Sequence, residues 1–146
     1  MIMTHTQLKY LSCISNIDRP VLLEKLSTWG FTVIIFDGAM VNNTTDLMNQ
    51  VGLQLGLQEE MIPKSWDAFR DAVFEVMATA GTDQVAMIWD NSDHMLSTDL
   101  QDLIQAATIL QDVAVATLRA RNVDSYFFLL GELPGYRRLD SFLKDI

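Results

Sequence analysis

Phe31-Thr32-Val33-Ile34-Ile35-Phe36 is a continuous run of β-branched and aromatic residues, bounded by Gly30 before it and by Asp37-Gly38 after it. Such a run is typical of a strand that is buried on both faces, as the strands of a parallel sheet are. Two later runs have the same character, Gln84–Trp89 and Tyr126–Leu130. We therefore expect three strands, with Phe31–Phe36 as the first central strand.

Helical segments are expected between these strands. Apolar residues recur at helical spacing in residues 44–55, 63–80 and 97–120, and a further helix, residues 20–29, precedes the first strand. Because crossovers of this length join parallel strands, the strands should run in one direction. The sequence predicts an α/β fold with a small three-stranded parallel sheet, helices packed on it, and an additional N-terminal helix.

Length and composition indicate a single domain, residues 1–146. The 146 residues are 49% hydrophobic and 20% charged, which is typical of a globular protein that buries a core of its own. We divide this domain into a core at 31–130, an N-terminal extension at 1–30 that carries a helix, and a C-terminal tail at 131–146. One last helical turn is expected in the tail, at Leu139–Leu143.

The sequence also suggests a cellular location. Cys13 is the only cysteine, so an internal disulfide cannot form and a reducing compartment is expected. Residues 1–9 lack the apolar segment of a signal peptide, and no apolar run reaches the roughly 18 residues of a membrane span. We expect a cytoplasmic protein that does not bind membranes.

The net charge of the chain indicates which class of macromolecule it could bind. The chain has 19 acidic and 10 basic residues, a net charge of −9 and a pI near 4.4. Binding to a nucleic-acid backbone relies on clustered Lys and Arg, which are missing here, so direct binding to nucleic acid is not expected. An acidic surface instead favours rapid association with basic proteins.

The segment that follows Ser65 is expected to be an amphipathic helix with an acidic face. At about 100° per residue, Asp67, Asp71 and Glu75 lie on one face, opposite an apolar face. The apolar residues are Trp66, Phe69, Val73, Val76 and Met77. Asp67 in the first turn benefits from the helix dipole, but like charges four residues apart cost about 0.2–0.5 kcal/mol. Arg70, between the aspartates, could form an ion pair with either, so a local charge cluster is the alternative to a binding surface.

The sequence Ser65-Trp66-Asp67-Ala68-Phe69-Arg70-Asp71-Ala72-Val73, between two apolar strands, resembles the barstar family of intracellular ribonuclease inhibitors. Trp66, Asp67, Ala68 and Asp71 match the family pattern, and Phe69 and Val73 are conservative replacements. The resemblance covers about Phe31–Leu130 in the order of its elements. The additional helix before the first strand resembles longer bacterial members of the family.

The resemblance implies a binding protein and not an enzyme. It implies an inhibitor, immunity protein or antitoxin that binds a basic ribonuclease or other nuclease toxin one to one and blocks its active site without a cofactor. Asp67 and Asp71 match the two inhibitory aspartates of the family. The expected partner-binding residues are Met61, Lys64, Asp67, Arg70, Asp71, Glu75 and Asp99, the last from the start of the next helix.

This chain departs from the family pattern around the acidic helix. The preceding loop, Glu60–Lys64, has neither the aromatic residue nor the glycine that the family supplies there. Lys64 and Arg70 place positive charge where the family has an acid or a tryptophan. These differences leave three targets open: a close relative of barnase, a related toxin with a differently shaped site, or a nuclease of another type.

Two alternatives rest on other residues. Asp37 and Asp90 each follow an apolar strand, the position of phospho-accepting carboxylates, and Asp90, Asp93 and His94 could bind a metal; these residues would suit a small phosphoryl-transfer or metal-dependent enzyme. Against that enzyme, Ala39 stands where a second aspartate would be needed. The other alternative is an acidic adaptor that uses the long helix, Thr98–Ala120. The expected apolar stripe of this helix is Leu100, Leu103, Ile104, Ala107, Leu110 and Val113.

Overall fold

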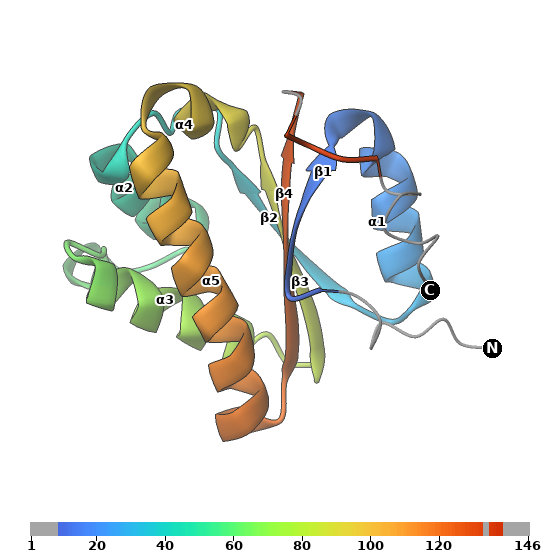
Figure 1. Ribbon diagram of the computed structural model, residues 1–146. Helices are drawn as coiled ribbons and strands as arrows, with labels where there is room; N and C mark the ends of the chain where they lie inside the picture. Colours follow the sequence, from blue (N-terminus) through green and yellow to red (C-terminus); the bar gives the residue numbers. More distant parts are fainter. Residues whose placement is uncertain (1–8, 133–134, 139–146) are drawn as a thin grey trace.

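The computed structural model describes residues 9–132 and 135–138 (Figure 1). Its centre is a parallel sheet of four strands, in the order β1-β4-β3-β2. The strands are β1 (Leu11–Ser15), β2 (Thr32–Asp37), β3 (Gln84–Asp90) and β4 (Asp124–Gly131). The α/β class and the parallel direction are confirmed.

The expectation of three strands is wrong, because β1 adds a fourth at the edge beside β4. β1 has five residues and places only two apolar side chains, Leu11 and Ile14, in a segment that also holds two serines. Such a short, mixed segment gives no continuous apolar run. Its strand conformation depends on pairing with β4, which lies more than a hundred residues further along the chain.

The expected central position of Phe31–Phe36 is also wrong. β2 pairs with β3 only and forms the other edge of the sheet, and Ile35 is 42% exposed. The two interior strands are β3 and β4, whose residues are buried almost throughout. An apolar run therefore identified the strand correctly, but it did not distinguish an edge from the centre.

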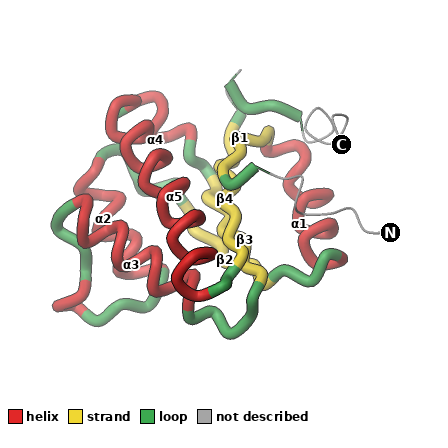
Figure 2. Tube along the Cα trace, turned by 60° about the horizontal axis from the view of Figure 1, so that its bottom comes forward, coloured by secondary structure: helices red, strands yellow, loops and turns green. Residues whose placement is uncertain are grey.

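Helices cover both faces of the sheet, so the described chain forms three layers (Figure 2). On one face lie α2 (Thr44–Gln54), α3 (Trp66–Ala78), α4 (Asp93–Thr98) and α5 (Leu100–Arg121). On the other face lies α1 (Arg19–Thr28). Two short 3₁₀ turns, η2 (Asn16–Asp18) and η3 (Glu59–Met61), precede α1 and α3.

The sheet separates two apolar clusters. Because neighbouring residues of a strand point to opposite faces, Phe127 and Leu129 pack under α3 and α5, whereas Phe128 and Leu130 pack under α1. Phe69, Val73 and Met77 anchor α3 to the first cluster, and Leu22 and Leu26 anchor α1 to the second.

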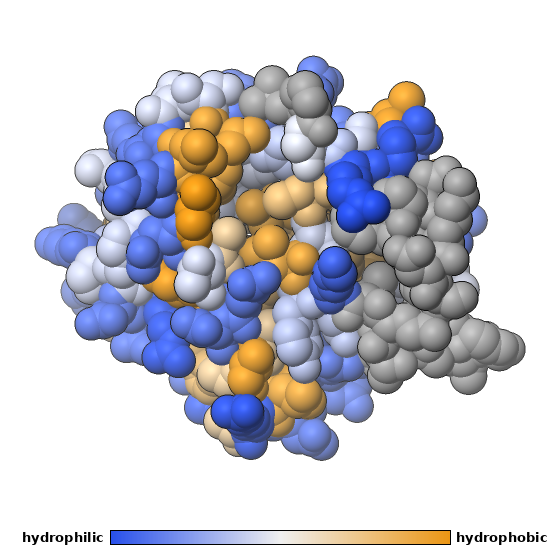
Figure 3. Space-filling model, viewed as in Figure 1, coloured by the Kyte–Doolittle hydropathy of each residue, from blue (hydrophilic) through white to orange (hydrophobic). Residues whose placement is uncertain are grey.

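The long C-terminal helix begins later than expected. Ser97 and Thr98 end α4, and Asp99 caps α5 by accepting a hydrogen bond from the backbone N–H of Asp102 at 3.3 Å. The expected apolar stripe is partly wrong, since Leu100 and Ile104 are 52% and 57% exposed. Apolar side chains gather over this part of the surface in Figure 3. The buried residues of α5 are Leu103, Ala106, Ile109, Leu110, Val113, Ala114 and Thr117.

Two remaining expectations concern the ends of the chain and membranes. The helical turn expected at 139–143 lies outside the described residues. Of the helices that the structure describes, none has both the length and the apolarity needed to cross a membrane.

Candidate protein-binding site

The helix α3 is fixed at its start and along its buried face. Ser65 caps it, because the Ser65 hydroxyl accepts a hydrogen bond from the Ala68 N–H at 3.0 Å. Trp66 and Phe69 meet edge to face, with ring centroids 5.6 Å apart, and Phe69 is buried in the first apolar cluster. A capped and packed helix holds the residues of its outer face in fixed relative positions.

Asp67 and Asp71 lie on this outer face, and both side chains are exposed. Among residues 9–132 and 135–138, neither carboxylate forms an ion pair or a side-chain hydrogen bond. They stand four residues apart, a spacing that brings the two Cβ atoms to within about 5–6 Å. The result is a pair of adjacent negative charges that no cation of the described residues neutralises.

Glu75, the third acid of the stripe, is in a different situation. Its Oε1 accepts a hydrogen bond from the Arg121 guanidinium at 3.3 Å, and both side chains are largely exposed. The same guanidinium lies 5.4 Å from the ring centroid of Phe74. Glu75 is thus partly neutralised by α5, so the accessible negative charge is concentrated at Asp67 and Asp71.

Arg70 does not pair with either aspartate. Its exposed side chain lines a groove between α3 and α5, and it has no ion pair with any acid of the described segments. The local charge cluster that the sequence left open is therefore not what the structure contains.

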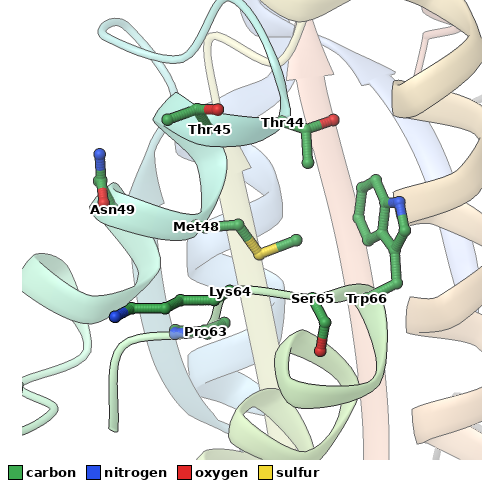
Figure 4. Close-up of a pocket in the computed structure, with 8 residues that line it drawn as sticks. All are labelled: Thr44, Thr45, Met48, Asn49, Pro63, Lys64, Ser65 and Trp66. Atoms are coloured by element: carbon green, nitrogen blue, oxygen red, sulfur yellow. The ribbon is translucent and has the colours of Figure 1, made fainter. Parts of the chain in front are cut away.

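A cleft of about 430 Å³ opens beside the start of α3, between this helix and α2 (Figure 4). Its walls are Thr44, Thr45, Met48, Asn49, Pro63, Lys64, Ser65 and Trp66. In Figure 4 the side chain of Met48 points from α2 toward the Trp66 ring, and Lys64 extends away from Trp66. The cleft is lined by both apolar and polar side chains, and one of them, Trp66, directly precedes Asp67 in the sequence.

Two further expected site residues, Met61 and Asp99, lie outside α3. Met61 is in η3 before the cleft and is 63% exposed. Asp99 is half-buried and caps α5, which is a role within the chain itself. A contact between Asp99 and a partner stays a prediction.

Sequence reasoning missed the part of the surface that α2 and α5 supply. Thr44 and Thr45, expected only as part of a helix at residues 44–55, line the cleft. The cap of α2 is Asn43, whose side chain accepts a hydrogen bond from the Asp46 N–H at 2.9 Å. Arg119 and Asp112 of α5 line the groove with Arg70. No local pattern brings residues more than 40 positions apart together; only the packing of α3 against α5 does.

Asp37 and Asp90, on which the enzyme alternative rests, form hydrogen bonds with other residues of the chain. Asp37 and Asp90 are neighbours at the carboxyl ends of β2 and β3. Asp90 accepts two hydrogen bonds from the Arg19 guanidinium, each 2.8 Å, which tie α1 to the sheet. Asp37 accepts from the Asn91 side chain and from the Ala39 N–H, both at 2.9 Å, and these bonds lower the pKa of Asp37. Both groups are engaged by neighbours within the chain.

The metal alternative gains no support from the arrangement of side chains. Within the described ranges, no group of three or more His, Cys, Asp or Glu side chains is placed so that it could hold a metal ion. His94 is exposed, and the side chain of Asp93 accepts a hydrogen bond from the Glu132 N–H at 3.3 Å. Burial raises the pKa of the Cys13 thiol, which disfavours the thiolate that a nucleophile would need.

Comparison with known proteins gives one match. The family model described as Barstar (barnase inhibitor) matches residues 31–129. This range runs from the residue before β2 to within β4, and it includes all of α3. Comparisons with curated proteins and with solved structures gave no match.

Proposed function

Because this chain belongs to the barstar family, a family of ribonuclease inhibitors, we propose that it binds one basic ribonuclease and covers its active site with α3. The observation that carries this proposal is the exposed pair Asp67 and Asp71 on a capped helix, with no cation of the described chain neutralising either. The two side chains also match the positions of the family's inhibitory aspartates.

The chemistry of the target explains why carboxylates would block it. A ribonuclease must hold the phosphates of its substrate, so its active site concentrates Arg, Lys and His. Carboxylates form charge-assisted hydrogen bonds with these groups, which are bidentate where arginine is the donor. Because α3 is already rigid, little conformational entropy is lost when Asp67 and Asp71 are bound.

The charge of the whole chain supports the same encounter. A net charge of −9 attracts a cationic enzyme over distances comparable to the Debye length, about 8 Å at physiological salt. Association should therefore become slower as salt is added.

The proposal is tested by titrating the protein into barnase and into a panel of other basic microbial ribonucleases while RNA cleavage is followed. We expect at least one enzyme to be inhibited at a ratio of one to one, and we expect a mononucleotide in its active site to slow formation of the complex. Failure to inhibit any member of the panel at micromolar concentration would contradict the proposal. So would inhibition that an occupied active site does not slow.

A further inference from the structure

A second charged feature lies beside the acid pair, in a groove of about 450 Å³ between α3 and α5. Arg70 stands on the α3 side, and Asp112, Val115, Ala116, Arg119 and Ala120 stand on the α5 side. Arg70 and Arg119 are both exposed, whereas Val115 and Ala116 are half-buried and form an apolar floor. The groove therefore presents two guanidinium groups across a shallow apolar surface.

These two arginines differ from others in the described chain. Arg19 is paired with Asp90, Arg121 with Glu75 and Arg138 with Asp18. No carboxylate in the described ranges lies within ion-pair distance of Arg70 or Arg119, although Asp112 lines the same groove. The whole chain has a net charge of −9, whereas the residues that line this groove include two cations and one anion. The groove is therefore locally positive.

The groove lies beside the acid pair on α3. At about 100° per residue, Arg70 is turned roughly 60° from Asp67 and roughly 100° from Asp71 around α3. Arg70 therefore borders the acid pair on its α5 side, and a protein that covers both aspartates reaches the groove where its contact surface extends toward α5. Every group of that protein which lies over the groove will meet positive charge.

We propose that the groove binds a carboxylate, an Asp or Glu side chain that the ribonuclease carries at the edge of its active site, between Arg70 and Arg119. This inference rests on the proposed function and adds a specificity element to it. The guanidinium group suits the purpose because its planar fork binds a carboxylate through two parallel hydrogen bonds. A ribonuclease with Lys or Arg at that position would be repelled, so the groove selects among basic enzymes.

The direction in which Kd changes distinguishes this proposal from an effect of net charge alone. Replacing Arg70 or Arg119 by Gln makes the inhibitor more acidic, and net charge alone would then strengthen binding to a basic enzyme. A carboxylate in the groove requires the opposite result. We expect R70Q and R119Q each to raise Kd about three- to ten-fold, and the double variant to raise it further.

A variant of Asp112, on the α5 side of the groove, provides a second test. Replacing Asp112 by Asn removes a negative charge, which by net charge alone would weaken binding. If a carboxylate of the partner occupies the groove, D112N removes a repulsion and lowers Kd. Lys25→Gln is the matched control for R70Q, because it removes one positive charge from α1 on the opposite face of the sheet.

The measurement is calorimetric titration of the ribonuclease that the unmodified protein inhibits most strongly, with thermal melting to show that each variant is folded. Weaker binding of R70Q and R119Q, together with tighter binding of D112N and little change in K25Q, is the expected pattern. Unchanged or tighter binding of the arginine variants, with Asp67 and Asp71 still required, would overturn the groove alone. If the unmodified protein binds no ribonuclease, the proposed function fails and this inference fails with it.

Discussion

The three acids of α3 share one face of the helix but differ in their surroundings. Asp67 and Asp71 form no ion pair within the described chain, whereas Glu75 already accepts a hydrogen bond from Arg121 in an ion pair. An exposed ion pair of this kind contributes about 0–1 kcal/mol to stability, so it restrains Glu75 only weakly. Asp67 and Asp71 should therefore contribute more to partner binding than Glu75.

Ser65 is the residue whose hydroxyl fixes the start of this helix. Removing the hydroxyl in S65A leaves the Ala68 N–H without its acceptor, and we expect the free energy of unfolding to fall by about 1 kcal/mol. Glycine is tolerated at such caps, so S65G should cost only a few tenths of a kcal/mol. Urea unfolding of the two variants measures the difference. Equal stabilities for S65A and S65G would contradict the capping role.

At the scale of elements, the position of α3 depends on how closely the preceding loop approaches α2. Gly52 permits that approach, since a Cβ atom on it would lie only 2.5 Å from Cγ1 of Ile62. Ile62 lies between η3 and α3, so a shift of this side chain would move the loop that leads into the acidic helix.

A double-mutant cycle tests this contact. In G52A the added methyl group collides with Ile62, which offsets the gain in helix propensity of roughly 1 kcal/mol that Gly→Ala otherwise brings. In an I62A background the collision is absent and the gain should be realised. We expect a coupling energy of about 1 kcal/mol or more by urea unfolding. Additive effects of the two substitutions would show that the approach does not constrain the loop.

The elements that sequence could predict are those with a local signature. The runs at 31–36, 84–89 and 126–130 correspond to β2, β3 and β4, and the amphipathic helix expected after Ser65 is α3. β1 has no such signature, because its strand conformation is supplied by β4. The start of the long helix was expected at 97–98 because Ser and Thr favour the beginning of a helix, whereas Ser97 and Thr98 end α4 and Asp99 caps α5.

The candidate site likewise has one part that the sequence could predict and another part that it could not. The acidic face of α3 follows from helical periodicity, and the structure places Asp67 and Asp71 on the exposed side of the helix. The cleft and the groove could not be predicted, since each is formed by two helices that only tertiary packing brings together. The exposure of Leu100 and Ile104 has the same origin, because the face of α5 that is buried depends on where α3 and the sheet lie.

At the scale of the whole molecule, the layer formed by α1 is as important to the fold as the layer that carries the acids. The family match begins at residue 31, yet α1 and β1 lie before it. Leu22 and Leu26 of α1 cover Ile88, Phe128 and other side chains on that face of the sheet. β1 and α1 are therefore part of the core and not an appendage.

Two substitutions in α1 test this conclusion. Leu26 is fully buried, so L26A should lower the free energy of unfolding of the whole protein by about 2–5 kcal/mol. Val21 on the same helix is 45% exposed, and V21A should cost much less. Thermal unfolding followed by far-UV and near-UV circular dichroism should show one shared transition that moves in L26A. A separate early transition confined to α1 would contradict an integrated core.

Asp67 and Asp71 are proposed to bind the active site of a ribonuclease, and replacing both residues together tests this proposal most directly. The measurement is the Kd of D67N/D71N for the ribonuclease that the unmodified protein inhibits, beside E24Q/E132Q, which removes the same charge from exposed positions outside α3. Losing two charge-assisted contacts should weaken binding at least a hundred-fold, about 2.8 kcal/mol, while the control changes it only slightly. Equal affinities for the two double variants would show that net charge, and not this helix face, binds the enzyme.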